Sequence, residues 1–359
     1  RTHPNPWSAI TLNFNKVLFP MMIWMIACLV VLLFSFVATW GLRRYALATK
    51  LMDVPNARSS HSQPTPRGGG VAIVLVFLAA LVWMLSAGSI SGGWGGAMLG
   101  AGSGVALLGF LDDHGHIAAR WRLLGHFSAA IWILLWTGGF PPLDVVGHAV
   151  DLGWLGHVLA VFYLVWVLNL YNFMDGIDGI ASVEAIGVCV GGALIYWLTG
   201  HVAMVGIPLL LACAVAGFLI WNFPPARIFM GDAGSGFLGM VIGALAIQAA
   251  WTAPSLFWCW LILLGVFIVD ATYTLIRRIA RGEKFYEAHR SHAYQFASRR
   301  YASHLRVTLG VLAINTLWLL PLALMVALGW ISGFIGILVA YAPLCLLAVG
   351  YKAGSLEKS

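Results

Sequence analysis

The stretch NLYNFMDGIDG, residues 169–179, places two carboxylates and two amides between two long apolar runs. An ionised side chain beside hydrocarbon costs roughly 2.5–3.5 kcal/mol even on a lenient scale, so such a cluster requires a reason. Asn172, Asp175 and Asp178 are three residues apart, and a helical turn would place them on one face. The two glycines disfavour a continuous helix and let the backbone approach a ligand. One aspartate alone would indicate a helix end facing water. The cluster predicts a site, because similar clusters recur along the chain.

The composition around this stretch is that of a polytopic membrane protein. Of the 359 residues, 61% are hydrophobic and 9% are charged, whereas soluble domains carry about 25% charged residues. The five cysteines lie in apolar runs without paired or metal-ligand spacing, which favours small buried hydrophobes over a disulfide or zinc framework. A net charge of +7 would suit nucleic acid. Its distribution indicates membrane orientation instead, so no nucleic-acid partner is expected.

Eleven apolar runs predict an all-α protein with about eleven transmembrane helices, each near the ~20 residues that a bilayer requires. The first run exceeds the ~7–15 residues of a signal-peptide core. The fourth run is short, and only Gly329 and Trp330 separate the last two runs. The fourth run or the last pair could therefore be miscounted. The runs are 17–42, 69–88, 94–111, 121–137, 153–171, 180–199, 203–221, 234–251, 255–276, 305–329 and 331–350.

Basic residues gather in alternate loops. With eleven spans, 18 of the 20 Lys and Arg residues lie on one side, all except Arg1 and Lys16. The positive-inside rule makes this side cytoplasmic, which places the N-terminus in the periplasm and the C-terminus in the cytoplasm. Aspartates from several helix ends fall at or near the same face, and this predicts a cytoplasmic active site. They are Asp53, Asp112, Asp113, Asp175, Asp178, Asp232 and Asp270.

One transmembrane catalytic domain is predicted over residues 17–350. Its cytoplasmic loops are expected near 43–68, 112–122, 172–179, 222–233 and 277–304. Residues 1–16 form a polar N-terminal segment and residues 351–359 a cytoplasmic tail. An origin in an expression vector is left open for part of each terminus.

Two further segments carry groups suited to phosphate and metal chemistry. Asp112 and Asp113 repel each other unless a cation, a proton or a base such as Arg120 or Arg122 intervenes, although a solvated helix end explains the pair equally well. In residues 222–236 a Pro-Pro pair ends a helix, and a glycine-rich turn leads to Asp232. This carboxylate could bind a metal beside phosphate-binding amides, or only cap the next helix.

Two loops add basic and aromatic groups. In the longest loop, 277–306, His289 and His292 flank Arg290 and suit an anionic substrate. The basic residues there could also only set topology, and zinc is disfavoured because no cysteine or third ligand is near. Phe229 could stack on a base or anchor at the interface. The loop 52–70 by itself indicates only a structured loop.

Taken in order, these segments resemble the polyprenyl-phosphate N-acetylhexosamine-1-phosphate transferases, glycosyltransferase family 4. The motifs are the Asp112-Asp113 pair, NxxDGxDG from Asn172 and NxPPAxxFMGDxGS from Asn222, and the resemblance runs from about Asp53 to His292. It implies that undecaprenyl phosphate attacks the β-phosphorus of a UDP-N-acetylamino sugar and releases UMP. It also implies a requirement for Mg²⁺, with Mn²⁺ as a substitute, in a multi-pass enzyme of the bacterial inner membrane. A homodimer is left open.

The resemblance implies roles for individual residues. Asn172 and Asp232 match metal ligands. Asp112 and Asp113 match a catalytic pair, one of which would deprotonate or orient the lipid phosphate. The remaining catalytic positions are Asp175 and His292, and the substrate-binding positions are Gly176, Ile177, Asp178, Asn222, Phe229 (under the uracil), Arg120, His289 and Arg290.

Two departures from the family pattern leave the donor sugar open. The residues from His292 to Gln295 replace a His-x-His-His stretch, and Gln63 replaces a common lysine. Both lie where sugar and phosphate would be recognised. The run HRSHAYQ, residues 289–295, resembles the O-antigen-initiating branch, which uses 6-deoxy amino sugars such as N-acetylfucosamine or N-acetylquinovosamine.

An ion- or proton-coupled transporter is the main alternative, because intramembrane acids often mark ion paths. Transporter sites lie near the membrane midplane, however, whereas these acids gather at one face. An intramembrane aspartyl protease would need two aspartates sharing a proton, and Asp232 has no obvious partner at matching depth. A scaffold would leave the acid cluster unexplained.

Overall fold

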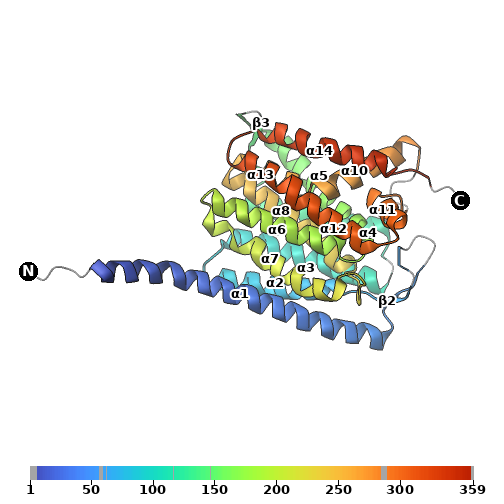
Figure 1. The fold of residues 1–359 in the computed structure, drawn as a ribbon, viewed down its shortest axis with the longest axis horizontal. Helices are drawn as coiled ribbons and strands as arrows, with labels where there is room; N and C mark the ends of the chain where they lie inside the picture. Colours follow the sequence, from blue (N-terminus) through green and yellow to red (C-terminus); the bar gives the residue numbers. More distant parts are fainter. Residues whose placement is uncertain are drawn as a thin grey trace, which may run out of the picture.

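Helices make up nearly all of the regular structure in the computed structural model (Figure 1). It describes residues 6–55, 60–61, 63–115, 117–145, 147–283 and 289–356, with side chains from residue 22 onward. Arg1, Arg58, Lys284 and Lys358, which were counted in the charge asymmetry, lie outside these residues. The helices are α1 (Pro6–Thr49), α2 (Gly70–Ser86), α3 (Gly92–His114), α4 (Ala119–Thr137), α5 (Gly153–Met174), α6 (Ile180–Leu198), α7 (Gly206–Asn222), α8 (Asp232–Thr252), α9 (Pro254–Leu263), α10 (Gly265–Ala280), α11 (Ala293–Tyr301), α12 (His304–Ile314), α13 (Leu320–Ala327) and α14 (Gly333–Gly350).

Short elements complete the described chain. Two small antiparallel hairpins pair β1 (Met52–Asp53) with β2 (Thr65–Pro66), and β3 (Leu143–Val145) with β4 (His148–Val150). A 3₁₀ turn, Val202–Met204, precedes α7, and a π-helical turn, Asn315–Leu319, joins α12 to α13.

Every predicted apolar run is occupied by helix, and the chain is a polytopic membrane protein. By length and hydropathy, eight described helices could cross a membrane, or nine if a bent pair forms one span. That pair is α9 and α10, which meet at 72°, so the run predicted over 255–276 is not one straight helix. α2 has only 17 residues, and α4, which carries Arg120 and Arg122 in its first turn, is not among the eight. The count of eleven spans therefore stays a prediction.

α8 is the central helix of the bundle. Its best apolar window is 94% buried, against 17% for α1 at the edge. α8 packs against α2, α3, α5 and α9, whereas α1 packs mainly on α7 and runs beyond the bundle at its N-terminal end (Figure 1). α1 begins at Pro6, well before the predicted start at residue 17, because the helix continues through the polar segment.

The start of α8 is tied to the start of α2. Gly69 and Gly70 donate backbone hydrogen bonds to the carbonyls of Phe229 and Met230, and Phe229 donates to that of Pro66. The turn before α8 therefore lies against the loop that contains β2. This pairing builds one wall of the site described below.

Candidate active site

The conspicuous polar stretch of the sequence begins inside a helix and continues into a loop. α5 ends at Met174, and α6 begins at Ile180, so Asn172 is helical whereas Asp175 and Asp178 belong to the connection. The predicted interruption of the helix is confirmed. The three side chains therefore reach the site from a helix end and from a loop rather than from one helical face.

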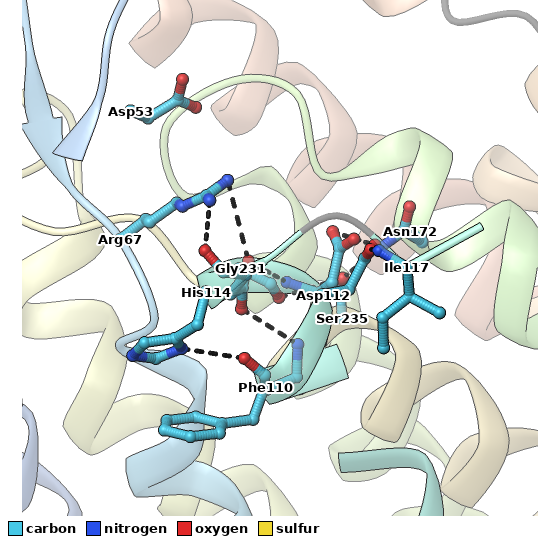
Figure 2. Close-up of polar contacts among 12 residues, drawn as sticks. Asp53, Arg67, Phe110, Asp112, His114, Ile117, Asn172, Gly231 and Ser235 are labelled. Atoms are coloured by element: carbon cyan, nitrogen blue, oxygen red, sulfur yellow. Dashed lines mark hydrogen bonds and ion pairs between the residues drawn. The ribbon is translucent and has the colours of Figure 1, made fainter. Parts of the chain in front are cut away.

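The carboxylate pair at the end of α3 is held by charged and backbone donors (Figure 2). Asp112 accepts hydrogen bonds from Arg122 Nη1 at 2.5 Å and from the backbone N–H of Ile117 at 2.8 Å. Asp113 accepts from the backbone N–H groups of Asp232 and Ala233 at 3.3 and 3.4 Å. The end of α3 thus caps the start of α8, where unpaired amides favour a negative charge.

Gly231 permits this approach of α3 to α8. Its φ of +79° lies in the left-handed region, and a Cβ there would lie 2.6 Å from Asp113 Oδ2. A side chain at this position would displace the carboxylate. The glycine of the MGD sequence is therefore required by both backbone conformation and space.

Asp232 links the carboxylate pair to α5. Its Oδ1 accepts from Asn172 Nδ2 at 2.9 Å, and its Oδ2 lies 3.5 Å from Arg122 Nη1. Asn172 also donates to Ser235 Oγ at 2.9 Å. The Asp232 side chain remains 38% exposed, in contrast to Asp113 at 3%. Asp232 is thus the carboxylate with room for an additional ligand.

A cavity of about 310 Å³ lies over these groups, and its lining brings together residues from widely separated segments. Ten predicted site residues line it: Asp113, Asn172, Asp175, Gly176, Ile177, Asp178, Asn222, Phe229, Asp232 and His289. Asn222 is buried, and it bonds through its side chain to the backbone N–H of Gly179 and the backbone carbonyl of Ile228. It therefore joins the two loops that carry Asp178 and Phe229.

Four predicted residues do not line this cavity. Asp112 faces a smaller neighbouring cavity of about 40 Å³ together with Arg122 and His126. Arg120 is exposed and lies over the ring of Trp121, 5.6 Å from its centroid. Arg290 and His292 are also absent from the lining.

His292 is buried behind the cavity, where it helps to start α11. Its Nδ1 lies 3.3 Å from Asp270 Oδ1, and the carboxylate also accepts from the backbone N–H groups of Ala293 and Tyr294 at 2.9 and 3.0 Å. Asp270 thus caps α11 from α10. The His292 ring packs on that of His289, with centroids 4.8 Å apart, so it supports the histidine that does reach the cavity.

The His289 ring is neutral. Burial, the neighbouring His292 and Arg278 together lower the pKa of His289 to about 3. Its Nδ1 lies 2.9 Å from Ser291 Oγ and accepts from the Ser291 backbone N–H at 3.3 Å. The proton of the neutral ring is therefore on Nε2, which can serve as a hydrogen-bond donor.

The cavity has an excess of negative charge. Burial, followed by the charges of Asp232, Asp113 and Asp178, raises the pKa of Asp175 to about 7. Asp178 differs, because hydrogen bonds from His304 and from the Ala226 backbone N–H outweigh burial and lower its pKa. A bound cation would relieve the repulsion among Asp113, Asp175 and Asp232.

The donor set suits a hard cation that keeps part of its shell for substrate. Among the described residues, no three carboxylate, imidazole or thiol side chains converge to form a metal cage by themselves. Mg²⁺ is usually held by one or two carboxylates plus substrate phosphates. The accessible carboxylate of Asp232 and the amide oxygen of Asn172 fit this mode of binding.

Several cavity residues were not assigned from the sequence. Arg67 donates to the backbone carbonyl of Asp113, and its Nη1 lies 4.0 Å from Asp113 Oδ1 (Figure 2). His61 packs edge-on against Phe229, with ring centroids 4.9 Å apart. Gln295 and His304 also line the cavity. Gln295 belongs to the stretch that departs from the family pattern, but it was given no role. For Arg67, His61 and His304 the available signal was their position in basic loops, which did not distinguish them from their neighbours.

Known proteins are similar to this chain over most of its length. The model of glycosyl transferase family 4 matches residues 96–250, which begin within α3 and end in the last turn of α8. A probable undecaprenyl-phosphate N-acetylglucosaminyl 1-phosphate transferase from Bacillus subtilis is 31% identical over 317 residues, covering 86% of this chain and 87% of that protein. A decaprenyl-phosphate N-acetylglucosaminephosphotransferase from Mycobacterium tuberculosis is 28% identical over 310 residues, covering 77% and 76%.

A phospho-N-acetylmuramoyl-pentapeptide-transferase from Geobacillus thermodenitrificans is 29% identical over 249 residues, covering 66% of this chain and 75% of that protein. The apolar helices and these relatives together define an integral membrane transferase. The chain belongs to the polyprenyl-phosphate N-acetylhexosamine-1-phosphate transferases of glycosyl transferase family 4. The transporter alternative has no support among these relatives.

Proposed function

We propose that this chain transfers an N-acetylamino-sugar 1-phosphate from a UDP-sugar to undecaprenyl phosphate and releases UMP. An oxygen of the lipid phosphate forms a bond to the β-phosphorus, and the bond from that phosphorus to the bridging oxygen breaks. UMP leaves with the bridging oxygen. The observation that carries the proposal is the cavity in which Asp113, Asp175, Asp232 and Asn172 meet Phe229 at the helix ends.

The proposed role of each residue follows from its position in the site. Asp112 and Asp113 are proposed as the catalytic pair, one of which deprotonates or orients the lipid phosphate. Arg122 pairs with Asp112 and reaches Asp232, so it would supply positive charge near the transferred phosphoryl group. Asp232 and Asn172 would hold Mg²⁺, which neutralises charge on the diphosphate when bound.

The nucleotide would lie toward Phe229, Asn222 and the 176–178 turn, with the uracil on the Phe229 ring. The enzyme is proposed to act at the cytoplasmic face of the bacterial inner membrane, where basic residues gather. The run from His289 to Gln295 favours a 6-deoxy amino sugar donor and an initiating role in O-antigen synthesis. Mn²⁺ is proposed as a substitute for Mg²⁺, and a homodimer stays open to measurement.

The test is a reaction of the purified protein with undecaprenyl phosphate, Mg²⁺ and a panel of UDP-amino sugars. UMP release is measured with and without EDTA. We expect metal-dependent UMP from one donor. The Asp151→Asn protein serves as an active control, because Asp151 is exposed, accepts from the backbone N–H of nearby Gly153 and does not line the cavity. No UMP from any donor, with the protein shown to be folded, would contradict the proposal.

A further inference from the structure

We infer that His304 is a positioning residue that joins two loops bounding the cavity and thereby sets the affinity for the nucleotide part of the donor. The inference rests on the proposed function. His304 is the first residue of α12, follows the N-cap Ser303, and was not assigned a role from the sequence. It lines both the 310 Å³ cavity and an adjoining cavity of about 720 Å³.

The His304 ring contacts two separate loops. Its Nδ1 lies 3.2 Å from Asp178 Oδ1, and its Nε2 lies 3.1 Å from the backbone carbonyl of Ser60. The backbone N–H of Asp178 also lies 3.4 Å from Nδ1, and it can donate to that nitrogen only when Nδ1 carries no proton. A carboxylate and a carbonyl oxygen both accept hydrogen bonds, so a ring that satisfies both carries a proton on each nitrogen.

Both carboxylate oxygens of Asp178 have a partner within the protein. Its Oδ2 accepts from the backbone N–H of Ala226 at 3.0 Å, while Oδ1 faces His304. Its backbone carbonyl accepts from Thr308 Oγ1 at 2.8 Å, one turn after His304 on α12. The His304–Asp178 pair therefore joins α12, the 175–179 turn, the segment after Pro225 and the loop at Ser60.

These contacts lie on the side of the cavity away from the carboxylate pair. His304, Asp178, His61 and Phe229 line both cavities, whereas Asp113 and Asp232 line only the first of the two. Among the described residues, no hydrogen bond joins His304 to Asp112, Asp113 or Asp232. Loss of the imidazole should therefore loosen the loops around the nucleotide and leave the reacting groups in place.

The test compares His304→Ala, His304→Gln and a His201→Ala control, whose imidazole hydrogen-bonds to nearby Thr199 at 2.9 Å and does not line the cavity. Binding of UMP with Mg²⁺ is measured by calorimetry, and kcat and KM are measured for donor and lipid. We expect His304→Ala to raise the UMP Kd and the donor KM about tenfold, with kcat and the lipid KM within about threefold, since the loss concerns binding rather than the transition state.

Further comparisons among variants sharpen the result. His304→Gln keeps one hydrogen-bond donor and should recover part of the affinity, and it replaces His304→Ala if that protein does not fold. Asp178→Asn should weaken UMP binding similarly, and the double variant should be no worse than either single one, because both remove the same contact. A fall in kcat with unchanged UMP affinity, or no change at all, would overturn the inference.

The measurement of UMP binding separates the proposed transfer reaction from the proposed role of His304. If the wild-type protein binds UMP but turns over no donor, the proposed reaction fails while the role of His304 is still tested. If the wild-type protein does not bind UMP with Mg²⁺, the inference itself fails.

Discussion

Asp232 is the residue on which the proposed site depends most directly. It contacts Asn172 and Arg122, and its side chain is the most accessible of the clustered carboxylates on α3 and α8. The substitution Asp232→Asn keeps the shape of the side chain and removes its negative charge. We expect transfer to fall by at least about 100-fold, because electrostatic stabilisation dominates phosphoryl transfer. UMP release, with a melting curve in detergent, checks this; undiminished turnover in the folded variant would contradict the assigned site.

The titration of Asp175 predicts how pH affects cation binding. A pKa of about 7 means that the carboxyl is largely protonated at pH 6 and ionised at pH 8. Because a cation favours the ionised form, affinity for Mg²⁺ should rise with pH, by up to about tenfold per pH unit below the pKa. Calorimetry with Mg²⁺ alone measures this. Asp175→Asn should flatten the profile, and a flat wild-type profile would refute the prediction.

At the scale of elements, the approach of α3 to α8 places the carboxylates beside one another. Gly109 lies where a Cβ would be 2.5 Å from the backbone nitrogen of Ala233 and 2.6 Å from the carbonyl carbon of Asp232. Gly109→Ala should push the two helices apart, at a cost of about 1–3 kcal/mol, and lower activity as Asp232 shifts.

Gly104 provides a matched control on the same helix, since a Cβ there meets nothing within 4 Å. Gly104→Ala should keep both activity and melting temperature, because alanine is the better helix former. The two variants are compared by thermal unfolding and by UMP release. Equal melting temperatures and equal rates of UMP release for Gly109→Ala and Gly104→Ala would show that the contact between α3 and α8 does not position the site.

At the scale of the whole molecule, the charge asymmetry predicts how the chain lies in the membrane. The β3–β4 hairpin should face the periplasm and the residues after α14 the cytoplasm. His148 in β4 and Leu356 after α14 are both exposed. In a background that lacks exposed Cys345, an impermeant maleimide should label His148→Cys in intact cells, and Leu356→Cys only after permeabilisation. The reverse pattern would invert the proposed topology.

The sequence by itself determined the class of protein, the helical runs and the segments that build the site. These are local properties: a bilayer requires long apolar stretches, and glycine and proline interrupt them wherever they occur. The motifs from Asn172 and Asn222 therefore identified eight residues that line one cavity, and the Asp112-Asp113 pair and the 289–295 run added Asp113 and His289. The same reasoning did not reveal the bend between α9 and α10, because the apolar run continues through it.

Only the tertiary structure decided which neighbouring side chains face the cavity. Arg120 and Arg122 are two positions apart, which is roughly 200° of helical rotation, so α4 directs only Arg122 toward Asp112 and Asp232. His289 reaches the cavity while His292 caps α11, because Asp270 on α10 holds that turn. His304 is more than a hundred residues from Asp178 in sequence. Their contact depends on how α12 packs, which no local pattern encodes.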